Sequence, residues 1–511
     1  MRRGVGHGSG NKALPKSNAA DDAEVVPPAP PSERNYLQKA FFTGKNGANV
    51  ASRRLEVEPR GFCRYTAPPT FLMHSFEYHK GRLCCEKVDL AQLAQEAGTP
   101  TYVYSANTIT DHYRRLDQAF ADVPHLICYA VKANSNIGIL NLLAQEHSGF
   151  DIVSAGELYR VQKAGGKPEQ CTFAGVGKTE AEIKYALQQG ILAFNIESES
   201  ELRYINQVAA SLQHRAPVSL RVNPDVEADT HKYISTGKSE NKFGIAFEQV
   251  AAVYEAASKM PNIAIRGVQM HIGSQITKVG PFAEAVRKMA PLVHKLKERY
   301  GIEYFSIGGG IGIVYDESLE SGPECWWEAN PKGRMTVREY ADAVIPILKE
   351  LKLKILLEPG RYMVGNAGVL LTRVLYLKRG GEKKFVIVDA GMNDLIRPAL
   401  YEGFHQIVPL KQPSGDALER VDVVGPVCES GDFFAQDRPL PPLEEGDLIA
   451  IMSAGAYGFT MASNYNSRPL PAEVLVNGSH AAVIRERQSL HDLIRGESIP
   501  TCHGVAEPVA P

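Results

Sequence analysis

The sequence predicts an α/β fold in which a parallel (β/α)₈ barrel is followed by a smaller β-rich domain. Between residues 105 and 360, short apolar runs alternate with helix-like segments. Eight βα units over about 250 residues match the size of a closed barrel of the TIM type. A doubly wound parallel sheet is the alternative, because the period of a sequence cannot show whether a sheet closes. The predicted strands are 126–131, 149–153, 171–174, 191–196, 218–222, 265–271, 304–307 and 354–358.

Beyond residue 360 the pattern changes to β-rich runs that are separated by Gly and Pro turns. Examples are residues 369–376, 385–389 and 447–452. Such runs are typical of an antiparallel sandwich or barrel, which we assign to residues 361–497. The segment 71–104 is also strand-like, and we expect it to join this second domain.

The two ends of the chain lack a sustained period. Residues 1–70 contain clusters of Gly, Ser, Pro and Ala, so we predict a disordered extension there and a flexible tail over 498–511. An excess of basic residues makes a transit peptide an alternative, but the acidic cluster of Asp21, Asp22 and Glu24 argues against it. We therefore predict a cytoplasmic protein, with a plastid location as the alternative.

The composition excludes several kinds of partner and site. Of the 511 residues, 44% are hydrophobic and 22% are charged, as in ordinary globular proteins. A net charge of −2 does not indicate a nucleic acid or an anionic membrane as partner. No apolar run reaches the roughly 18 residues that span a bilayer. The eight cysteines form no CxxC pair and no His/Cys metal spacing, so we expect no metal, no disulfide framework and a reduced, intracellular chain.

Polar residues gather where five of the predicted strands end. In barrels of this type the chemistry lies at the C-terminal ends of the strands. Each residue alone has an ordinary explanation, such as a surface lysine, a core histidine or a glycine turn, but their common location favours one shared site. They are Lys132 after the first strand, Asp151 in the second, His271 and Ser274 at the sixth, Gly308, Gly309 and Gly310 after the seventh, and Glu358, Gly360 and Arg361 at the eighth.

These residue types are the ones by which proteins hold pyridoxal 5′-phosphate (PLP). Burying a lone lysine is costly, and one relief is to lower the pKa of its amine, so Lys132 is the candidate for covalent attachment. The glycine run leaves backbone N–H groups for a phosphate, and Ser274 adds a hydroxyl. Glu358 would favour a protonated pyridine nitrogen, and His271 offers a flat face for stacking.

A different motif, Gly175-Val176-Gly177-Lys178-Thr179, resembles a nucleotide-binding P-loop. A Walker A motif needs a glycine at position 172, and that position is Thr172. We therefore expect no nucleotide site in this segment.

Five longer motifs together carry a resemblance to a known family. They are Tyr129-Ala130-Val131-Lys132-Ala133-Asn134, His271-Ile272-Gly273-Ser274-Gln275, Glu358-Pro359-Gly360-Arg361, Gly425-Pro426-Val427-Cys428-Glu429-Ser430-Gly431-Asp432 and Ala454-Gly455-Ala456-Tyr457-Gly458. Over about residues 74–497 the chain resembles the fold-type III PLP-dependent decarboxylases. The resemblance implies a PLP-binding barrel, a β domain, and an obligate homodimer with its active sites at the subunit interface.

The resemblance also implies a role for each residue. The catalytic residues would be Lys132, His271 and Cys428, with Cys428 donating a proton from the other subunit. The cofactor would be bound by Lys132, Asp151, His271, Ser274, Gly308, Gly309, Gly310, Glu358, Gly360, Arg361 and Tyr457. The substrate would be bound by Arg361, Arg397 and Tyr401 at its distal carboxylate, by Glu429 at its distal amino group, and by Tyr457.

The implied reaction is the decarboxylation of meso-2,6-diaminopimelate to L-lysine. Two arginines that face one carboxylate favour a substrate with a distal carboxylate, because ornithine or lysine would leave them unpaired. The alternatives are a decarboxylase of ornithine, arginine or carboxynorspermidine and, less favoured, an alanine racemase. A non-catalytic regulatory homologue would be expected to lose Lys132 or Cys428, and both are present.

Overall fold

The computed structural model describes residues 73–226, 242–323, 326–327, 330, 334–501 and 504–505. The chain divides into two compact units, Met1–Ala67 and Pro68–Pro511, and everything below concerns the second. The predicted disordered extension of residues 1–70 lies outside the described residues, as do residues 502–503 and 506–511 of the predicted tail. None of the described helices is long and apolar enough to cross a membrane.

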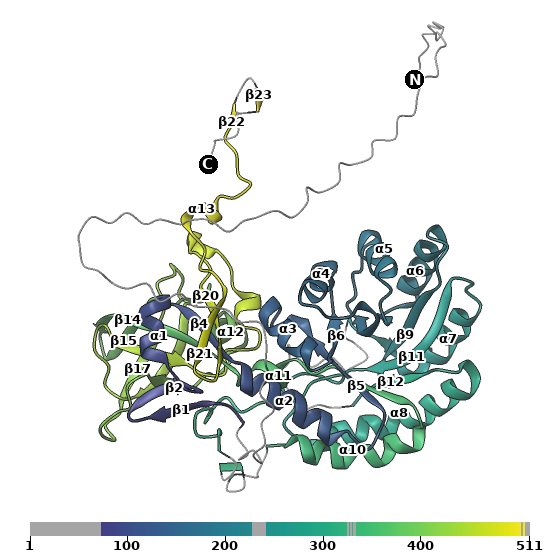
Figure 1. Ribbon diagram of the computed structural model, residues 1–511, viewed down its shortest axis with the longest axis horizontal. Coiled ribbons are helices and arrows are strands. Elements are labelled where there is room, and N and C mark those ends of the chain that lie inside the picture. Colours follow the sequence, from purple (N-terminus) through teal and green to yellow (C-terminus); the bar gives the residue numbers. More distant parts are fainter. Residues whose placement is uncertain are drawn as a thin grey trace, which may run out of the picture. The chain divides into compact units, whose positions relative to one another are not determined.

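A closed barrel of parallel strands forms the first part of this unit (Figure 1). The last barrel strand, β13, pairs with the first, β5, and β8 pairs with β9, so the ring has no free edge. The predicted barrel is therefore confirmed, and the doubly wound alternative is wrong. The strands are β5 (His125–Ala130), β6 (Gly149–Ile152), β7 (Cys171–Phe173), β8 (Ala193–Ile196), β9 (Ala216–Asn223), β11 (Ile263–Met270), β12 (Tyr304–Ser306) and β13 (Lys354–Leu357), with the short β10 (Ile245–Ala246) beside β9.

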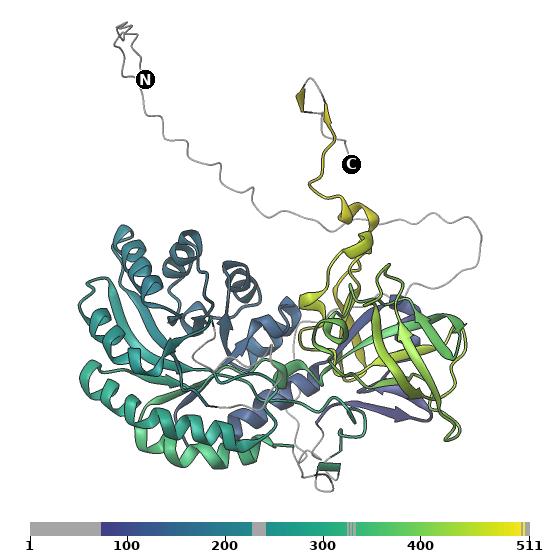
Figure 2. The same ribbon diagram turned by 180° about the vertical axis from the view of Figure 1, so that it is seen from behind.

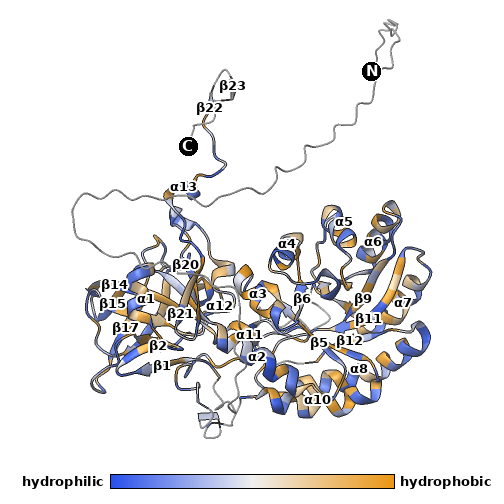
Figure 3. Ribbon diagram, in the orientation of Figure 1, coloured by the Kyte–Doolittle hydropathy of each residue, from blue (hydrophilic) through white to orange (hydrophobic). Residues whose placement is uncertain are grey.

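Helices surround the barrel strands, as Figures 1 and 2 show from opposite sides. In α8 the buried residues recur at intervals of three or four, which gives one apolar face, and Figure 3 shows hydrophobic and hydrophilic residues alternating along it. Strands β6, β7 and β8 are buried throughout, so they appear in the sequence as continuous apolar runs. The helices are α2 (Ala106–Ala119), α3 (Ile137–Gln145), α4 (Ala155–Lys163), α5 (Glu180–Gln189), α6 (Glu199–Ser211), α7 (Val250–Ser258), α8 (Val279–Tyr300) and α10 (Val337–Leu351).

Capped turns start helices directly after the barrel strands. Ser154 follows β6 and accepts a hydrogen bond from the backbone N–H of Glu157 at 3.2 Å. Ser198 follows β8 and does the same with Glu201 at 3.2 Å. A serine with a glutamate three residues later is a sequence signal for a helix N-terminus. These turns keep the loops at the C-terminal ends of the strands short and well defined.

Nine of the other strands form a second large sheet in the order β18-β17-β15-β14-β4-β20-β21, with β19 paired to β14 and β16 to β19. Most pairs are antiparallel, as predicted, but β15–β17 and β4–β20 are parallel. The antiparallel prediction is wrong for these two pairs because their strands are far apart in the chain and are not joined by hairpins. The strands are β4 (Thr101–Ser105), β14 (Gly368–Gly380), β15 (Lys383–Val388), β16 (Ile407–Pro409), β17 (Glu419–Val424), β18 (Phe433–Leu440), β19 (Leu448–Ile451), β20 (Ala472–Asn477) and β21 (His480–Arg485).

Strand β4 lies inside this second sheet although it precedes the barrel in sequence. It pairs with β14 on one side and β20 on the other, and all five of its residues are buried. Helix α2 begins at the next residue, so the chain passes directly from the sheet into the barrel. The smaller elements are β1 (Phe76–His79), β2 (Arg82–Cys85), β3 (Val88–Asp89), α1 (Leu90–Ala97), α11 (Arg361–Val364), α12 (Arg397–Tyr401), α13 (Leu490–Leu493), β22 (Pro500–Thr501) and β23 (Gly504–Val505).

A fully buried carboxylate, Glu473 on β20, ties the second sheet to the barrel. It accepts hydrogen bonds from the Tyr104 hydroxyl and from the Asn136 amide, both at 2.8 Å, and from Arg485. Asn136 also caps α3, accepting from the backbone N–H of Gly138 at 2.9 Å. Because Asn136 ends the loop that starts at Lys132, this network fixes the position of that loop.

Replacement of Glu473 by alanine is expected to lower the free energy of unfolding by about 2–4 kcal/mol. The cost falls on Tyr104 and Asn136, which lose a buried acceptor, whereas the Arg485 side chain is 30% exposed and can bond to water instead. Urea denaturation followed by circular dichroism measures the effect. As a control, Glu419→Ala breaks a surface ion pair and should cost less than about 1 kcal/mol; equal losses in the two variants would contradict the assignment.

Candidate active site

Lys132 lies just beyond the end of β5 and forms an ion pair with a buried carboxylate. Its Nζ is 2.5 Å from Oδ2 of Asp151, a residue of β6 that pairs with Ala130 of β5. Burial disfavours the charged amine, but the Asp151 carboxylate outweighs this effect and raises the pKa of Lys132. From the sequence we expected a lone buried lysine with a lowered pKa. That expectation is wrong, because Lys132 is paired with Asp151. The side chain remains 42% exposed, so the amine is open to a bound molecule.

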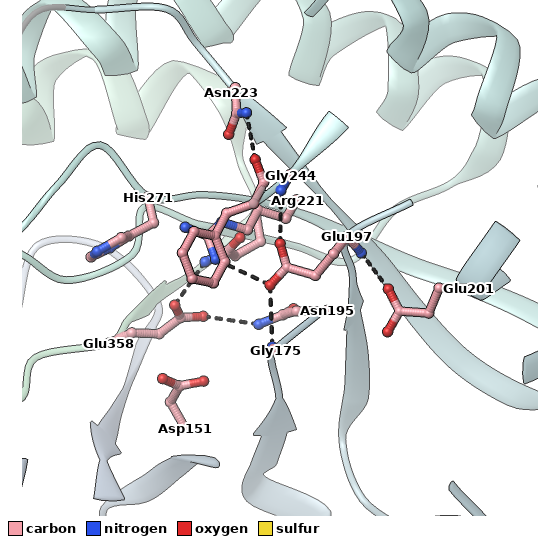
Figure 4. Close-up of polar contacts among 12 residues, drawn as sticks. Asp151, Gly175, Asn195, Glu197, Glu201, Arg221, Asn223, Gly244, His271 and Glu358 are labelled. Atoms are coloured by element: carbon pink, nitrogen blue, oxygen red, sulfur yellow. Dashed lines mark hydrogen bonds and ion pairs between the residues drawn. The ribbon is translucent and has the colours of Figure 1, made fainter. Parts of the chain in front are cut away.

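Glu358, which follows β13, is a buried carboxyl held by three polar side chains, of which Asn195 is labelled beside it in Figure 4. Ser306 and Gln269 each donate to it at 2.8 Å, and Asn195 donates at 3.4 Å. Burial, followed by the charge of Asp151, raises the pKa of Glu358 to about 7. This carboxyl is therefore poised to ionise fully when a cation is placed beside it.

His271, which follows β11, is held as a neutral ring. The backbone N–H of Gly309 donates to its Nδ1 at 3.3 Å. Burial first, and then the charges of Arg221 and Lys132, lower the pKa of His271 well below its usual value. Arg221 is itself paired with the buried Glu197 at 3.1 Å, as Figure 4 shows.

The glycine run after β12 packs so closely that side chains are excluded. A Cβ on Gly308 would lie 2.3 Å from the Met270 carbonyl oxygen, and one on Gly309 would lie 2.0 Å from that of Glu358. Gly308 and Gly310 also have φ of +71° and +107°, a region that side chains disfavour. The N–H groups of Gly308 and Gly309 bond to Ser306 and His271, and that of Gly310 has no hydrogen-bond partner among the described residues.

Two buried arginines, Arg361 on α11 and Arg397 on α12, lie close together without an acidic partner. Each is only 7% exposed, and neither forms an ion pair with any residue that the structure describes. The guanidinium of Arg361 lies 4.9 Å from the centre of the Tyr457 ring, and that of Arg397 lies 4.6 Å from the centre of the Tyr315 ring. Burial and the charge of Arg361 lower the pKa of Arg397. Two unpaired buried cations form a site for an anion.

Other predicted residues adjoin this arginine pair. Ser274 Oγ accepts from Nη2 of Arg361 at 3.2 Å, so Ser274 lies between the arginine and the glycine run. Tyr401 lies close enough to both arginines to interact with them electrostatically. The backbone N–H of Tyr457 donates to the Ala133 carbonyl at 2.8 Å, and a Cβ on Gly360 would lie 3.3 Å from the Tyr457 hydroxyl.

Cys428 and Glu429 do not join this cluster within one chain. They lie in the turn between β17 and β18, and both are exposed. Cys428 N–H donates to Asn466 at 2.9 Å, and Glu429 accepts from the Tyr465 hydroxyl at 2.5 Å. Neither residue contacts Lys132, the arginines or the glycine run in the part of the chain that the structure describes.

Lys178, in the segment that resembles a P-loop, is fully engaged by protein groups. Its side chain is 1% exposed, and its Nζ donates to the carbonyls of Gly175 and Asn195 at 2.7 and 2.9 Å and to Glu201 at 2.6 Å. This segment therefore lacks the free lysine that a nucleotide-binding loop requires.

Five residues in contact with the site were not foreseen from the sequence. Three of them, Asn195, Gln269 and Ser306, are polar residues within apolar barrel strands, and that break in the pattern was a usable signal. The other two, Tyr315 and His405, lie in loops where no periodicity marks them. They contact the two arginines.

Comparison with known proteins agrees with this geometry. The family model described as "Pyridoxal-dependent decarboxylase, pyridoxal binding domain" matches residues 106–365, half of the chain. This range contains the barrel and ends just after Arg361.

Comparison with individual proteins identifies a narrower group within this family. A diaminopimelate decarboxylase from Vibrio cholerae is 50% identical over 430 residues, covering 84% of this chain and 99% of that protein. The structure of diaminopimelate decarboxylase from Helicobacter pylori complexed with L-lysine has a TM-score of 0.74 and 42% identity, covering 80% of this chain and 98% of that one. That from M. jannaschii in co-complex with L-lysine has a TM-score of 0.77 and 38% identity, covering 84% and 99%. The chain belongs to the pyridoxal-dependent decarboxylases, in the group of the diaminopimelate decarboxylases.

The residues at the end of the barrel fit PLP, the cofactor of this family. Glu358 is a buried carboxyl that forms no ion pair with a described residue, and a protonated pyridine nitrogen would supply the missing cation. Lys132 offers an accessible amine, and His271 offers a neutral ring. The N–H of Gly310, which has no partner in the described part of the chain, lies on the same end of the barrel.

The pKa of Glu358 predicts a pH dependence of stability in the protein stripped of PLP. Because the folded pKa of about 7 lies above the ordinary glutamate value of 4.5, the folded state binds this proton more tightly than the unfolded state. The corresponding stability is present below about pH 4.5 and is lost as the pH rises through 7, about 2.5 kcal/mol between pH 5 and 8. Other buried carboxyls, Glu157 and Asp394, also have pKa values raised to about 7 and contribute to the slope in both proteins. Denaturation at the two pH values should therefore show a loss that is larger in the wild type than in Glu358→Gln by this amount; the same slope in both would contradict it.

Proposed function

We propose that this chain uses PLP to decarboxylate meso-2,6-diaminopimelate to L-lysine and CO₂, the last step of lysine biosynthesis. The observation that carries the proposal is the pair of buried arginines, Arg361 and Arg397, without an acidic partner among the described residues. The substrate retains a carboxylate at the end that does not react, and L-lysine keeps that same carboxylate. The relatives solved with L-lysine support this choice of product.

The barrel residues would hold and polarise the cofactor. When bound, PLP supplies an electron-accepting ring that stabilises the carbanion left by the loss of CO₂. Lys132 binds the cofactor covalently, and Asp151 holds the amine in place. Glu358 keeps a proton on the pyridine nitrogen, and His271 stacks on the ring. Ser274 with the run Gly308 to Gly310 would bind the phosphate.

The two arginines would orient the substrate. Arg361, Arg397 and Tyr401 bind the distal carboxylate, and Tyr457, which packs against Arg361, contacts both cofactor and substrate. Charge-assisted hydrogen bonds from each guanidinium are worth roughly 1.5–3 kcal/mol. Binding at the distal end holds the reacting carbon in one orientation at the end of the barrel where Lys132 lies.

A second copy of the chain would supply Cys428 and Glu429 to the site. Cys428 and Glu429 are exposed and do not contact the Lys132 site within one chain, so a complete site needs them from a partner. We infer a homodimer in which Cys428 of one subunit protonates the former α-carbon in the other. Glu429 would bind the distal amino group.

We further propose a role for each domain and a cellular location for the chain. Residues 105–360 would bind PLP, and residues 361–497, joined by 71–104, would provide the substrate clamp and the groups offered to the partner. The cysteines in the described part of the chain carry free thiols, which supports a reducing, cytoplasmic setting; they are Cys84, Cys85, Cys128, Cys171 and Cys428.

The substrate proposal predicts a large preference among amino acids. With PLP present, the kcat/KM for meso-diaminopimelate should exceed that for ornithine, arginine and lysine by about 10⁴, because these leave the buried arginines unpaired. CO₂ release measured with all four amino acids side by side provides the test. A preference for ornithine would indicate a related decarboxylase, and absence of turnover on all four would indicate a non-catalytic homologue.

The shared site predicts complementation between two inactive variants. Lys132→Ala should lose the visible absorbance of lysine-bound PLP and all turnover, whereas Cys428→Ala should keep that absorbance and turn over slowly. After subunit exchange, mixed dimers contain one complete site, so an equal mixture should regain about one quarter of wild-type activity. Mixtures of one variant with itself are the control. If tagged subunits exchange and activity does not return, Cys428 does not act across the interface.

A further inference from the structure

A buried histidine, His405, lies next to Arg397 and contacts its guanidinium. It is fully buried, and its Nε2 is 2.7 Å from Nη1 of Arg397. Its Nδ1 is 2.8 Å from the backbone carbonyl oxygen of Met452, and Arg438 donates to the His405 carbonyl at 2.9 Å. His405 is therefore fixed on both sides before any ligand binds.

These two contacts determine the protonation of the ring. The Met452 carbonyl only accepts hydrogen bonds, so Nδ1 of His405 must carry a hydrogen. The Arg397 guanidinium only donates, so Nε2 must be the unprotonated acceptor. Burial, followed by the charge of Arg397, lowers the pKa of His405 to about 3, so the ring remains neutral near pH 7.

A second neutral residue, Tyr315, completes the support of the arginines. Its ring lies edge-on to His405, with centres 5.3 Å apart and planes at 82°, and its face lies 4.6 Å from the guanidinium carbon of Arg397. Its hydroxyl accepts from Nη1 of Arg361 at 2.5 Å. Both arginines are thus oriented by uncharged acceptors.

The neutrality of these acceptors has a consequence for binding. An Asp or Glu at position 405 would orient Arg397 equally well, but its charge would compete with an incoming carboxylate. A neutral imidazole fixes the guanidinium and leaves its charge uncompensated. The arginine then gains its counter-ion only from the ligand, which makes binding depend on the carboxylate of the ligand.

We propose that His405 is a positioning residue for substrate selectivity, holding Arg397 in the orientation that binds the distal carboxylate while leaving its charge free. This inference rests on the proposed function, because it assigns the anion at the arginine pair to the substrate. His405 acts through Arg397 and does not itself touch the reacting atoms.

Two variants distinguish the roles of the two nitrogen atoms of the His405 ring. In His405→Asn the amide can replace Nδ1 as donor to Met452 but cannot reach Arg397. In His405→Gln the side-chain oxygen can replace Nε2 as the acceptor for Arg397. We expect His405→Asn to raise the KM for meso-diaminopimelate about tenfold or more with kcat within about threefold, and His405→Gln to restore most of that loss.

A pair of inhibitors tests whether the effect concerns the carboxylate. L-lysine retains the distal carboxylate, and cadaverine is the same diamine without it. His405→Asn should raise the inhibition constant of L-lysine about tenfold and change that of cadaverine by less than about twofold. In an Arg397→Ala background, His405→Asn should add less than about twofold to the loss of L-lysine binding.

The outcomes distinguish the inference from the proposed function. If the wild-type holoenzyme does not act on meso-diaminopimelate, the proposed function fails. If the wild type is active and both variants match it, or both variants lose L-lysine and cadaverine equally, the role of His405 is overturned. If neither variant folds, a structure of the wild-type holoenzyme with L-lysine decides: Arg397 bridging the carboxylate and His405 Nε2 supports the inference, and a carboxylate bound elsewhere refutes it.

Discussion

The candidate site depends on the pairing of the first barrel strand, β5, with the last, β13. Their register places Leu357 opposite Ile127, and beyond the paired residues the backbone N–H of Ala130 donates to the Pro359 carbonyl at 2.9 Å. Lys132 follows β5 and Glu358 follows β13, so closing the ring brings together two groups that are far apart in the chain. If the same ring were opened between these two strands they would lie at opposite edges of the sheet, and the two groups would be far apart.

The second sheet fixes the loop that starts at Lys132, which closure of the barrel has brought close to Glu358. Asn134 donates to the Gly455 carbonyl at 3.2 Å, and the Tyr457 N–H donates to the Ala133 carbonyl. Asn136 is bound by Glu473 on β20. The lysine loop is therefore held by residues that lie more than three hundred positions later. This arrangement explains why the barrel alone, the part that the family model matches, is not the whole functional unit.

The sequence was sufficient to predict the barrel because its strands are buried on both faces and appear as continuous apolar runs. It was also sufficient to place Lys132, His271 and Glu358 together, because parallel strands end on one side of a barrel. It could not predict the parallel pairs of the second sheet, which join distant strands, or the raised pKa of Lys132, which depends on the distance to Asp151. Tyr315 and His405 were missed because a loop residue acquires its neighbours only from the tertiary fold.

The balance of charge in the site explains why a substrate with two carboxylates suits it. Arg361 and Arg397 are buried, form no ion pair with a described residue, and have neutral side chains as their oriented supports. The end of the site at these two arginines therefore carries positive charge that no described residue compensates. A ligand that brings anionic groups compensates this charge, whereas a diamine adds to it, so the preference for carboxylates follows from the protein before any contact with the substrate is made.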